Sequence, residues 1–207
     1  MADRSKQYAR LERFLRPLVK LVYRPKVYFE REGAELSLED PVLLVCNHVW
    51  HTDGTVINCL FRHNKIHHLA AKDRFEQGGF VKWYLEMSEC IPIDRKGIST
   101  DWIHDSVAVL TQKKETVAIF PEGRHEKEGE ILPFHSGAAT LAALTGVPVV
   151  VLYINGHYNL FKRFRMMMSE PFHLEPPTEG MTGDYISRQN NLLFNKMAEL
   201  KKRCSDL

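Results

Sequence analysis

Short apolar runs that alternate with helical patterns constrain the fold of this chain more than any other sequence feature. Val42–Cys46 and Val149–Ile154 are apolar throughout. Such runs are typical of strands covered on both faces, and the helical patterns between them are typical of crossover helices. Seven runs are predicted as strands, at residues 26–30, 42–46, 66–70, 90–93, 116–120, 149–154 and 164–168. We therefore expect an α/β fold with a mostly parallel, roughly seven-stranded sheet.

The helical patterns between these runs predict helices at about residues 54–63, 74–88, 100–113, 137–145 and 183–203. Thr100 and Ser136 are natural N-caps, and Gly146 followed by Pro148 ends the fourth helix. A chain of 207 residues can bury one substantial core but is short for two typical domains. We expect residues 26–207 to form one catalytic domain.

Residues 1–25 predict a separate amphipathic, basic helix. Residues 1–26 carry eight Lys or Arg against two acids, a net charge of +6, whereas the whole chain carries +2. Apolar residues recur there at a spacing of three or four, at Tyr8, Leu11, Leu15, Leu18 and Val22, with Phe14 and Leu21 beside them. Such a helix either lies on an anionic membrane surface or packs on its own domain, and the sequence leaves both open. Pro17 predicts a kink or a two-part helix.

The longest apolar stretch, Val147–Ile154, is much shorter than the ~20 residues of a spanning helix. The N-terminus also lacks the apolar segment of a secretory signal. We expect a peripheral protein on the cytoplasmic side of a membrane. The four cysteines lack zinc or redox spacing, and we expect reduced structural thiols. The chain beyond residue 26 is net acidic and has no nucleic-acid-binding motif, so no nucleic acid is expected as a partner.

The strongest candidate for chemistry follows the run at 42–46, where α/β sheets collect their sites. On one straight helix His48 and Asp53 would point about 140° apart. Thr52 or Asp53 can instead cap a helix that begins at Gly54, which leaves His48 on the connection before that helix. A carboxylate bonded to one ring nitrogen fixes the tautomer and raises the basicity of the other. The pattern predicts His48 as a general base oriented by Asp53.

Cationic residues follow three other predicted strands. Lys72, Arg95 and Arg124 each come directly or soon after a run, and Arg124 closes the turn that begins at Pro121. The carboxyl ends of parallel strands meet at one edge of a sheet, so these residues could form a cationic, phosphate-sized site beside His48. Each of them alone is more typical of solvated surface charge.

Four motifs occur in a fixed order along the chain. They are Asn47-His48-x4-Asp53, Ile91-Pro-Ile-Asp94-Arg95, Phe120-Pro-Glu122-Gly123 and Val147-Pro-Val-Val-Val151. Together they resemble the signature blocks of the glycerolipid acyltransferases, closest to the 1-acylglycerol-3-phosphate acyltransferase family. Ordered blocks are far more specific than any single motif.

The resemblance implies an enzyme of phospholipid biosynthesis with a thioester donor, acyl-CoA or acyl carrier protein, and with no bound cofactor or metal. It implies a lysophospholipid acceptor, foremost 1-acylglycerol-3-phosphate, which gives phosphatidic acid. By the same resemblance His48 deprotonates the acceptor hydroxyl and Asp53 orients His48. Acceptor binding is implied for Lys72, Arg95, Glu122 and Gly123, and Arg124 is a further candidate for the phosphate.

Three departures from the family pattern concern the acceptor. The third block usually reads Phe-Pro-Glu-Gly-Thr-Arg, whereas here Arg124 follows Gly123 directly and His125 stands in the usual Arg position. A usual proline in the fourth block is replaced by Val151, and a usual Lys or Arg before a Gly-Ala pair is displaced at His135-Ser136. A different lysolipid acceptor therefore stays open.

The chain has no Gly-x-Ser-x-Gly elbow and no Cys beside a plausible base, so we expect direct acyl transfer without a covalent intermediate. Two other functions stay open. One is a metal-dependent hydrolase, because His48, His51, His67 and His68 cluster in the sequence, although no third ligand has convincing spacing. The other is a non-catalytic peripheral protein that binds lipid through its basic N-terminus.

Overall fold

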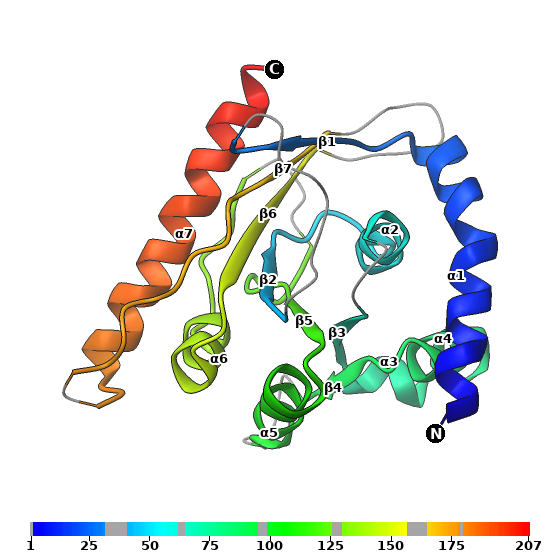
Figure 1. The fold of residues 1–207 in the computed structure, drawn as a ribbon, viewed down its shortest axis with the longest axis horizontal. Coiled ribbons are helices and arrows are strands. Elements are labelled where there is room, and N and C mark those ends of the chain that lie inside the picture. Colours follow the sequence, from blue (N-terminus) through cyan, green and yellow to red (C-terminus); the bar gives the residue numbers. More distant parts are fainter. Residues whose placement is uncertain are drawn as a thin grey trace.

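The computed structural model describes residues 2–31, 41–61, 65–94, 99–125, 130–156, 165–178 and 180–207. A sheet crosses the middle of the molecule and helices cover both of its faces (Figure 1). The strands are β1 Lys26–Phe29, β2 Leu43–Cys46, β3 Ile66–Ala71, β4 Ile91–Ile93, β5 Thr116–Ile119, β6 Val149–Asn155 and β7 Arg165–Met168. All seven predicted strands are present, although Phe164, the first residue of the last predicted strand, lies outside the described residues.

The sheet has the strand order β1-β7-β6-β2-β5-β3-β4. Every neighbouring pair is parallel except β6 and β7, which run antiparallel. The predicted α/β fold with a mostly parallel sheet is therefore confirmed. Because β2, β5 and β3 are parallel neighbours, the segments that follow them leave the sheet at the same edge.

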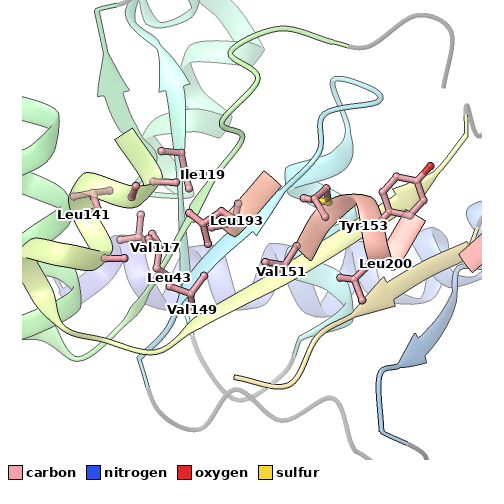
Figure 2. Packing of buried hydrophobic residues seen from close by; sticks show 14 of the residues in the cluster. Leu43, Val117, Ile119, Leu141, Val149, Val151, Tyr153, Leu193 and Leu200 are labelled. Carbon is pink, nitrogen blue, oxygen red and sulfur yellow. The ribbon is translucent and has the colours of Figure 1, made fainter. Parts of the chain in front are cut away.

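The central strands are apolar because both of their faces are covered. Leu44 and Cys46 of β2 belong to a core cluster shared with the first two helices, and Leu43 and Val45 belong to the cluster on the other face. Figure 2 shows that second cluster, in which strand residues meet side chains of the last helix such as Leu193. Fully burying each Val or Leu contributes about 1.5–3 kcal/mol relative to leaving it exposed.

The helices are α1 Ala2–Tyr23, α2 Asp53–Leu60, α3 Lys72–Glu76, α4 Gly79–Met87, α5 Asp101–Ala108, α6 Gly137–Thr145 and α7 Gly183–Ser205. The predicted single helix at 74–88 is wrong, because α3 and α4 are separate there. Gly78 and Gly79 both have positive φ angles, +70° and +62°, and so turn the chain sharply between them.

Three other boundaries differ from expectation. The backbone becomes extended at Phe61, so α2 ends at Leu60 instead of residue 63. The predicted helix at 100–113 is α5 followed by one π-helical turn, Val109–Lys113, which ends at Lys114 with a φ of +56°. Gly146, with a φ of +64°, ends α6 as predicted.

α1 is one unbroken helix through Pro17, so the predicted two-part helix is wrong. Its inner face is held by buried Tyr8 and Val19, which tie down the helix on both sides of the proline. Its outer face exposes Phe14, Leu18 and Leu21, which lie at helical spacing. The helix therefore packs on the domain with one apolar face and presents a second. Within the described ranges, no helix has the length and apolarity to cross a membrane.

Candidate active site

His48 lies on the loop between β2 and α2, and its Nδ1 atom is 2.8 Å from Asp53 Oδ2. The same oxygen accepts hydrogen bonds from the backbone N–H groups of Val49, at 2.8 Å, and Trp50, at 2.9 Å. Asp53 is fully buried at the start of α2, and these three hydrogen bonds offset the cost of burying a carboxylate there. The turn predicted between His48 and α2 is what allows the two side chains to meet.

The pairing fixes which nitrogen of His48 is available. A carboxylate acceptor requires the proton on Nδ1, which leaves the lone pair on Nε2. The His48 side chain is 21% exposed, whereas that of Asp53 is 0% exposed. The loop itself starts at a fixed point, because Asn47 exchanges two hydrogen bonds with the backbone of Ile154 on β6. The arrangement fixes the orientation of a partly exposed imidazole, which makes His48 a candidate base.

Glu122, on the loop after β5, is buried and ties this loop to its neighbours. Its Oε1 accepts from the backbone N–H of His48 at 3.3 Å, and its Oε2 accepts from that of Leu132 at 3.1 Å. Gly123 has a φ of +66°, and a Cβ atom there would lie 3.1 Å from the ring of His135. The backbone conformation therefore favours glycine, and a larger residue would also require the exposed ring of His135 to shift.

Two rings that the sequence analysis did not assign to the site pack against His48. The ring centroid of Phe120 lies 4.3 Å away, and that of His125 lies 4.0 Å away. Burial, with the nearby charges of His48 and His51, lowers the pKa of His125 to about 4. A neutral ring therefore stands beside the base at neutral pH. Both residues lie in or next to the third sequence block, which is the signal that could have identified them.

A buried polar chain runs beneath Phe120. His68 of β3 bonds through Nε2 to Asn58 Oδ1 at 2.8 Å, and Asn58 donates in turn to the hydroxyl of Tyr8 on α1. The His68 ring lies 6.0 Å from that of Phe120. Burial, reinforced by His67 and His48, lowers the pKa of His68 to about 3. These contacts join α1, α2 and β3 under the candidate base.

The predicted cations have different positions. Lys72 is the first residue of α3, directly after β3, and is exposed; Arg124 is also exposed, directly after Gly123. Arg95 lies outside the described residues. Arg74 of α3, which the sequence analysis did not single out, is close enough to His125 to contribute to lowering its pKa. Lys72 and Arg124 thus follow strands that end at the same edge as β2.

The histidine cluster does not gather around one point. His67 bonds to Glu115 at 2.6 Å and to the carbonyl of Glu89 at 2.9 Å, whereas His68 faces Asn58. Among the residues that the structure describes, no three His, Cys, Asp or Glu side chains are grouped to hold a metal ion.

An open groove lies on the other flank of the molecule, away from His48. Its lining includes Glu30, Glu170, Arg188, Leu192 and Lys196. Lys196 bonds to Glu30 at 2.5 Å, so one cation and one carboxylate of this groove are paired. No histidine lines this groove among the residues that the structure describes.

A histidine held by a buried carboxylate, at the carboxyl edge of a parallel sheet, defines a candidate base-catalysed α/β enzyme. The profile of the Acyltransferase family matches residues 24–155, more than half of the chain, and the protein belongs to that family.

Individual relatives carry more specific names. The chain is 36% identical over 78 residues to a chloroplastic 1-acyl-sn-glycerol-3-phosphate acyltransferase of Brassica napus, covering 37% of this chain and 22% of that protein. It is 32% identical over 120 residues to the human 1-acyl-sn-glycerol-3-phosphate acyltransferase alpha, covering 52% and 40%. The matched part thus spans less than half of either relative.

One solved structure covers nearly the whole chain. The crystal structure of the 1-acyl-sn-glycerophosphate (LPA) acyltransferase PlsC from Thermotoga maritima matches with a TM-score of 0.61 at 19% identity, covering 97% of this chain and 84% of that one. At this identity the match establishes a shared fold.

Proposed function

We propose that this chain transfers a fatty acyl group from a thioester donor to the free hydroxyl of a lysophospholipid. The proposed acceptor is 1-acylglycerol-3-phosphate, with phosphatidic acid as the product, and the donor is acyl-CoA or acyl carrier protein. The observation that carries the proposal is the 2.8 Å contact between His48 Nδ1 and Asp53 Oδ2 on the loop after β2. Family membership and the names of the relatives support it.

In the proposed mechanism His48 Nε2 removes the proton from the acceptor hydroxyl as the oxygen attacks the thioester carbonyl. The new C–O ester bond forms, the C–S bond breaks, and the proton passes from His48 to the departing thiolate. Asp53 holds the imidazole and stabilises its protonated form. A positioned base of this kind typically contributes about 10²–10⁴-fold in rate.

Direct transfer is supported by the state of the cysteines. Burial raises the pKa of Cys59 to about 11 and that of Cys90 to about 12, and Cys46 is fully buried with its pKa also raised by burial. A thiol with such a pKa contributes little thiolate near neutral pH. No described cysteine is therefore a ready nucleophile for a covalent intermediate.

The acceptor phosphate is proposed to bind the cations at the strand ends, Lys72, Arg95 and Arg124. Glu122 and Gly123 support the same site in a different way. The Glu122 carboxylate holds the backbone at His48, and Gly123 allows the tight turn against His135. Both therefore act on the substrate through the shape of the loop.

We further propose that the protein binds an anionic membrane surface peripherally through the helix in residues 1–25. The outer face of α1 supports this placement, because exposed Phe14 and Leu21 lie among the exposed cations Arg10, Arg13 and Lys20. Apolar side chains flanked by basic ones are typical of helices that lie in the headgroup region.

The function is tested by a grid of donors and acceptors in mixed micelles. Acyl-CoA and acyl carrier protein thioesters are paired with 1-acylglycerol-3-phosphate and with lysophospholipids of other headgroups, and products are identified by mass spectrometry. Phosphatidic acid is the expected product. His48→Ala is expected to lower kcat about 10³-fold or more, and a melting temperature above the assay temperature would show that the variant is folded.

The matched control is His104→Ala, which removes an exposed histidine on α5 and should leave kcat unchanged. Near-normal turnover by His48→Ala would remove His48 as the base. An absence of transfer for every donor and acceptor pair would refute the proposed function, and a clear preference for another headgroup would replace the proposed acceptor.

A further inference from the structure

We infer that α4 is a second membrane-contact element, which inserts aromatic side chains into an anionic phospholipid bilayer beside α1. The inference rests on the proposed function in one respect, because it concerns how a membrane-bound acceptor is brought to His48. The proposed partner of the exposed face of α4 is the lipid bilayer itself.

The first observation is the exposure of α4. Phe80 is 73% exposed, Trp83 is 44% exposed and Val81 is 43% exposed, whereas Met87 is the buried residue of this helix. The rings of Phe80 and Trp83 lie together, with their centroids 5.4 Å apart. A contiguous exposed group of large apolar side chains marks an interaction surface, and Trp and Phe are typical of side chains at membrane interfaces.

The second observation is continuity with α1. The two helices contact each other, and α4 lies beside the N-terminal half of α1 (Figure 1). Eleven large apolar side chains are exposed in the described residues, and six of them lie on these two helices: Phe14, Leu18, Leu21, Phe80, Val81 and Trp83. More than half of these exposed apolar side chains thus lie on two neighbouring helices, with those of α1 in its C-terminal half.

The third observation is charge, which favours a lipid surface over a protein partner. The excess of exposed basic residues is on α1, at Arg10, Arg13 and Lys20. On α3 and α4 the cations Lys72, Arg74 and Lys82 are matched by the acids Asp73, Glu76 and Glu86. Basic residues near an anionic bilayer add attraction to the insertion of apolar side chains. Together the two helices fit the interface of an anionic membrane.

The fourth observation links α4 to the candidate base. The hydroxyl of Tyr84 lies 2.8 Å from that of Thr55, so α4 is bonded to α2, the helix that begins with Asp53. At the other end of α4, Gly78 and Gly79 make the sharp corner that presents Phe80 outward, and a Cβ atom at either would meet nothing within 4 Å. An α4 seated in the headgroup region would therefore hold the His48 loop close to the membrane surface.

Vesicle binding tests the inference on the full chain. The double variant Phe80→Ser/Trp83→Ser is compared with Leu144→Ser/Leu192→Ser, which changes two side chains of 49% and 40% exposure on α6 and α7. On vesicles of phosphatidylglycerol and phosphatidylcholine, the α4 variant should bind about tenfold more weakly or worse, and the control variant should bind like the unchanged protein. Equal binding by both variants would overturn the inference.

Fluorescence quenching reports insertion directly. The chain has three tryptophans, so Trp50→Phe/Trp102→Phe leaves Trp83 as the reporter. Lipids brominated near the top of the acyl chain should quench Trp83 in anionic vesicles but not in phosphatidylcholine vesicles. An unquenched Trp83 would overturn the inference. If sedimentation then showed a dimer that Phe80→Ser/Trp83→Ser abolishes, α4 would be a contact between two copies instead.

Activity separates this inference from the proposed function. With a short-chain acceptor below its micelle concentration, Phe80→Ser/Trp83→Ser should keep its kcat, and with acceptor in vesicles it should lose about tenfold in kcat/KM. Equal kcat/KM for the variant and the unchanged protein on vesicles would contradict the inference. If the unchanged protein transfers no acyl group at all, the proposed function fails, whereas Trp83 quenching still decides the role of α4.

Discussion

Two carboxylates, the buried Asp53 beside His48 and the partly buried Glu30 after β1, differ in the charge of the groups that hydrogen-bond to them. Asp53 accepts hydrogen bonds from the His48 ring and from two backbone N–H groups. Glu30 accepts from Lys196 at 2.5 Å, from Arg203 at 3.3 Å and from the backbone of Glu170 at 3.1 Å. The hydrogen bonds of Glu30 described here thus include two from fixed cations, whereas those of Asp53 come from an imidazole and from backbone N–H groups.

The difference separates a carboxylate that contacts the candidate base from a carboxylate that holds two elements of the fold together. Burial alone would raise the pKa of Glu30, but the hydrogen bond from Lys196, the backbone of Glu170 and the charge of Arg203 outweigh it and lower that pKa. Its charge is already compensated, and the contacts fasten α7 to the end of β1. The hydrogen bonds of Asp53 come from the His48 ring and from two backbone N–H groups, so a proton on His48 would place a positive charge directly beside this carboxylate.

The largest expected effect is that of Asp53→Asn. An amide can keep some hydrogen bonds, but it no longer selects the tautomer with the free Nε2 and cannot balance an imidazolium, so kcat should fall about 10²–10⁴-fold. Steady-state transfer assays measure this loss. Asp101→Asn, at the start of α5, is the control and should leave kcat unchanged. If the kcat of Asp53→Asn stayed within tenfold of that of the unchanged protein, Asp53 would not have the proposed role beside His48.

Glu122→Gln should have a smaller effect, because the base and its carboxylate both remain. A glutamine replaces one acceptor oxygen with an N–H₂ group, which leaves the backbone N–H of His48 or Leu132 without its partner. We expect a loss of about 1–3 kcal/mol in the free energy of unfolding and a fall of about tenfold in kcat. Chemical denaturation and rate assays measure the two, with exposed Glu130→Gln as control. Unchanged stability would contradict a positioning role.

Glu30→Gln should affect stability alone. The side chains of Glu30 and Lys196 are 17% and 22% exposed, so solvent screens the pair in part, and we expect the free energy of unfolding to fall by about 1–2 kcal/mol. Urea denaturation measures the change, and kcat should stay the same. Glu199 is the other partner of Lys196, and its side chain is 51% exposed. Glu199→Gln should therefore lower the free energy of unfolding by about 0.5 kcal/mol or less. A fall in kcat for Glu30→Gln would contradict the prediction that Glu30 contributes to stability alone.

The smallest expected effect concerns pH. The pKa of His68 is about 3 in the folded protein against an ordinary value of 6.5, so below pH 6.5 the unfolded chain binds a proton that the folded protein does not. The free energy of unfolding should therefore fall as pH falls, by about 0.7 kcal/mol between pH 7 and pH 6 from this group. His68→Gln should flatten that slope in urea denaturation at the two pH values.

The contribution of Glu30 to the free energy of unfolding should change in a different pH range. A carboxylate with a lowered pKa contributes stability above its ordinary value of 4.5, and that contribution is lost as pH falls through the lower folded value. As pH falls, the contribution of His68 to stability should thus decrease first, and that of the contacts between Glu30 and α7 second. An unchanged slope for His68→Gln between pH 7 and pH 6 would contradict this order.

The sequence was sufficient to predict the features that depend on residues close together in the chain. Strands covered on both faces must be apolar along their whole length, and for this reason runs such as Val42–Cys46 could be identified. The contact of His48 with Asp53 could be predicted because a turn at Thr52 lies between them in the sequence. The turn between α3 and α4 also has a local signal, the pair Gly78-Gly79. The helical pattern of the residues around this pair led instead to the prediction of a single helix.

Other features depend on segments that are distant in sequence. The charge of Glu122 looked like that of a solvated turn, yet its carboxylate is buried because the backbone N–H of His48, 74 residues away, meets it. The rings of Phe120 and His125 reach His48 across two loops, and no spacing rule connects them. Such contacts follow from packing of the whole sheet edge, which periodicity does not encode.

The bond from Asn58 to the hydroxyl of Tyr8 makes the first helix part of the support of the candidate active site as well as a candidate membrane anchor. A shortened chain without residues 1–25 would leave the amide of Asn58, and with it the ring of His68, without its terminal support. Loss of activity on truncation would then be no measure of membrane attachment. A foreign anchoring helix joined at residue 26 should restore attachment but not turnover, unless it returns a phenol to the position of Tyr8.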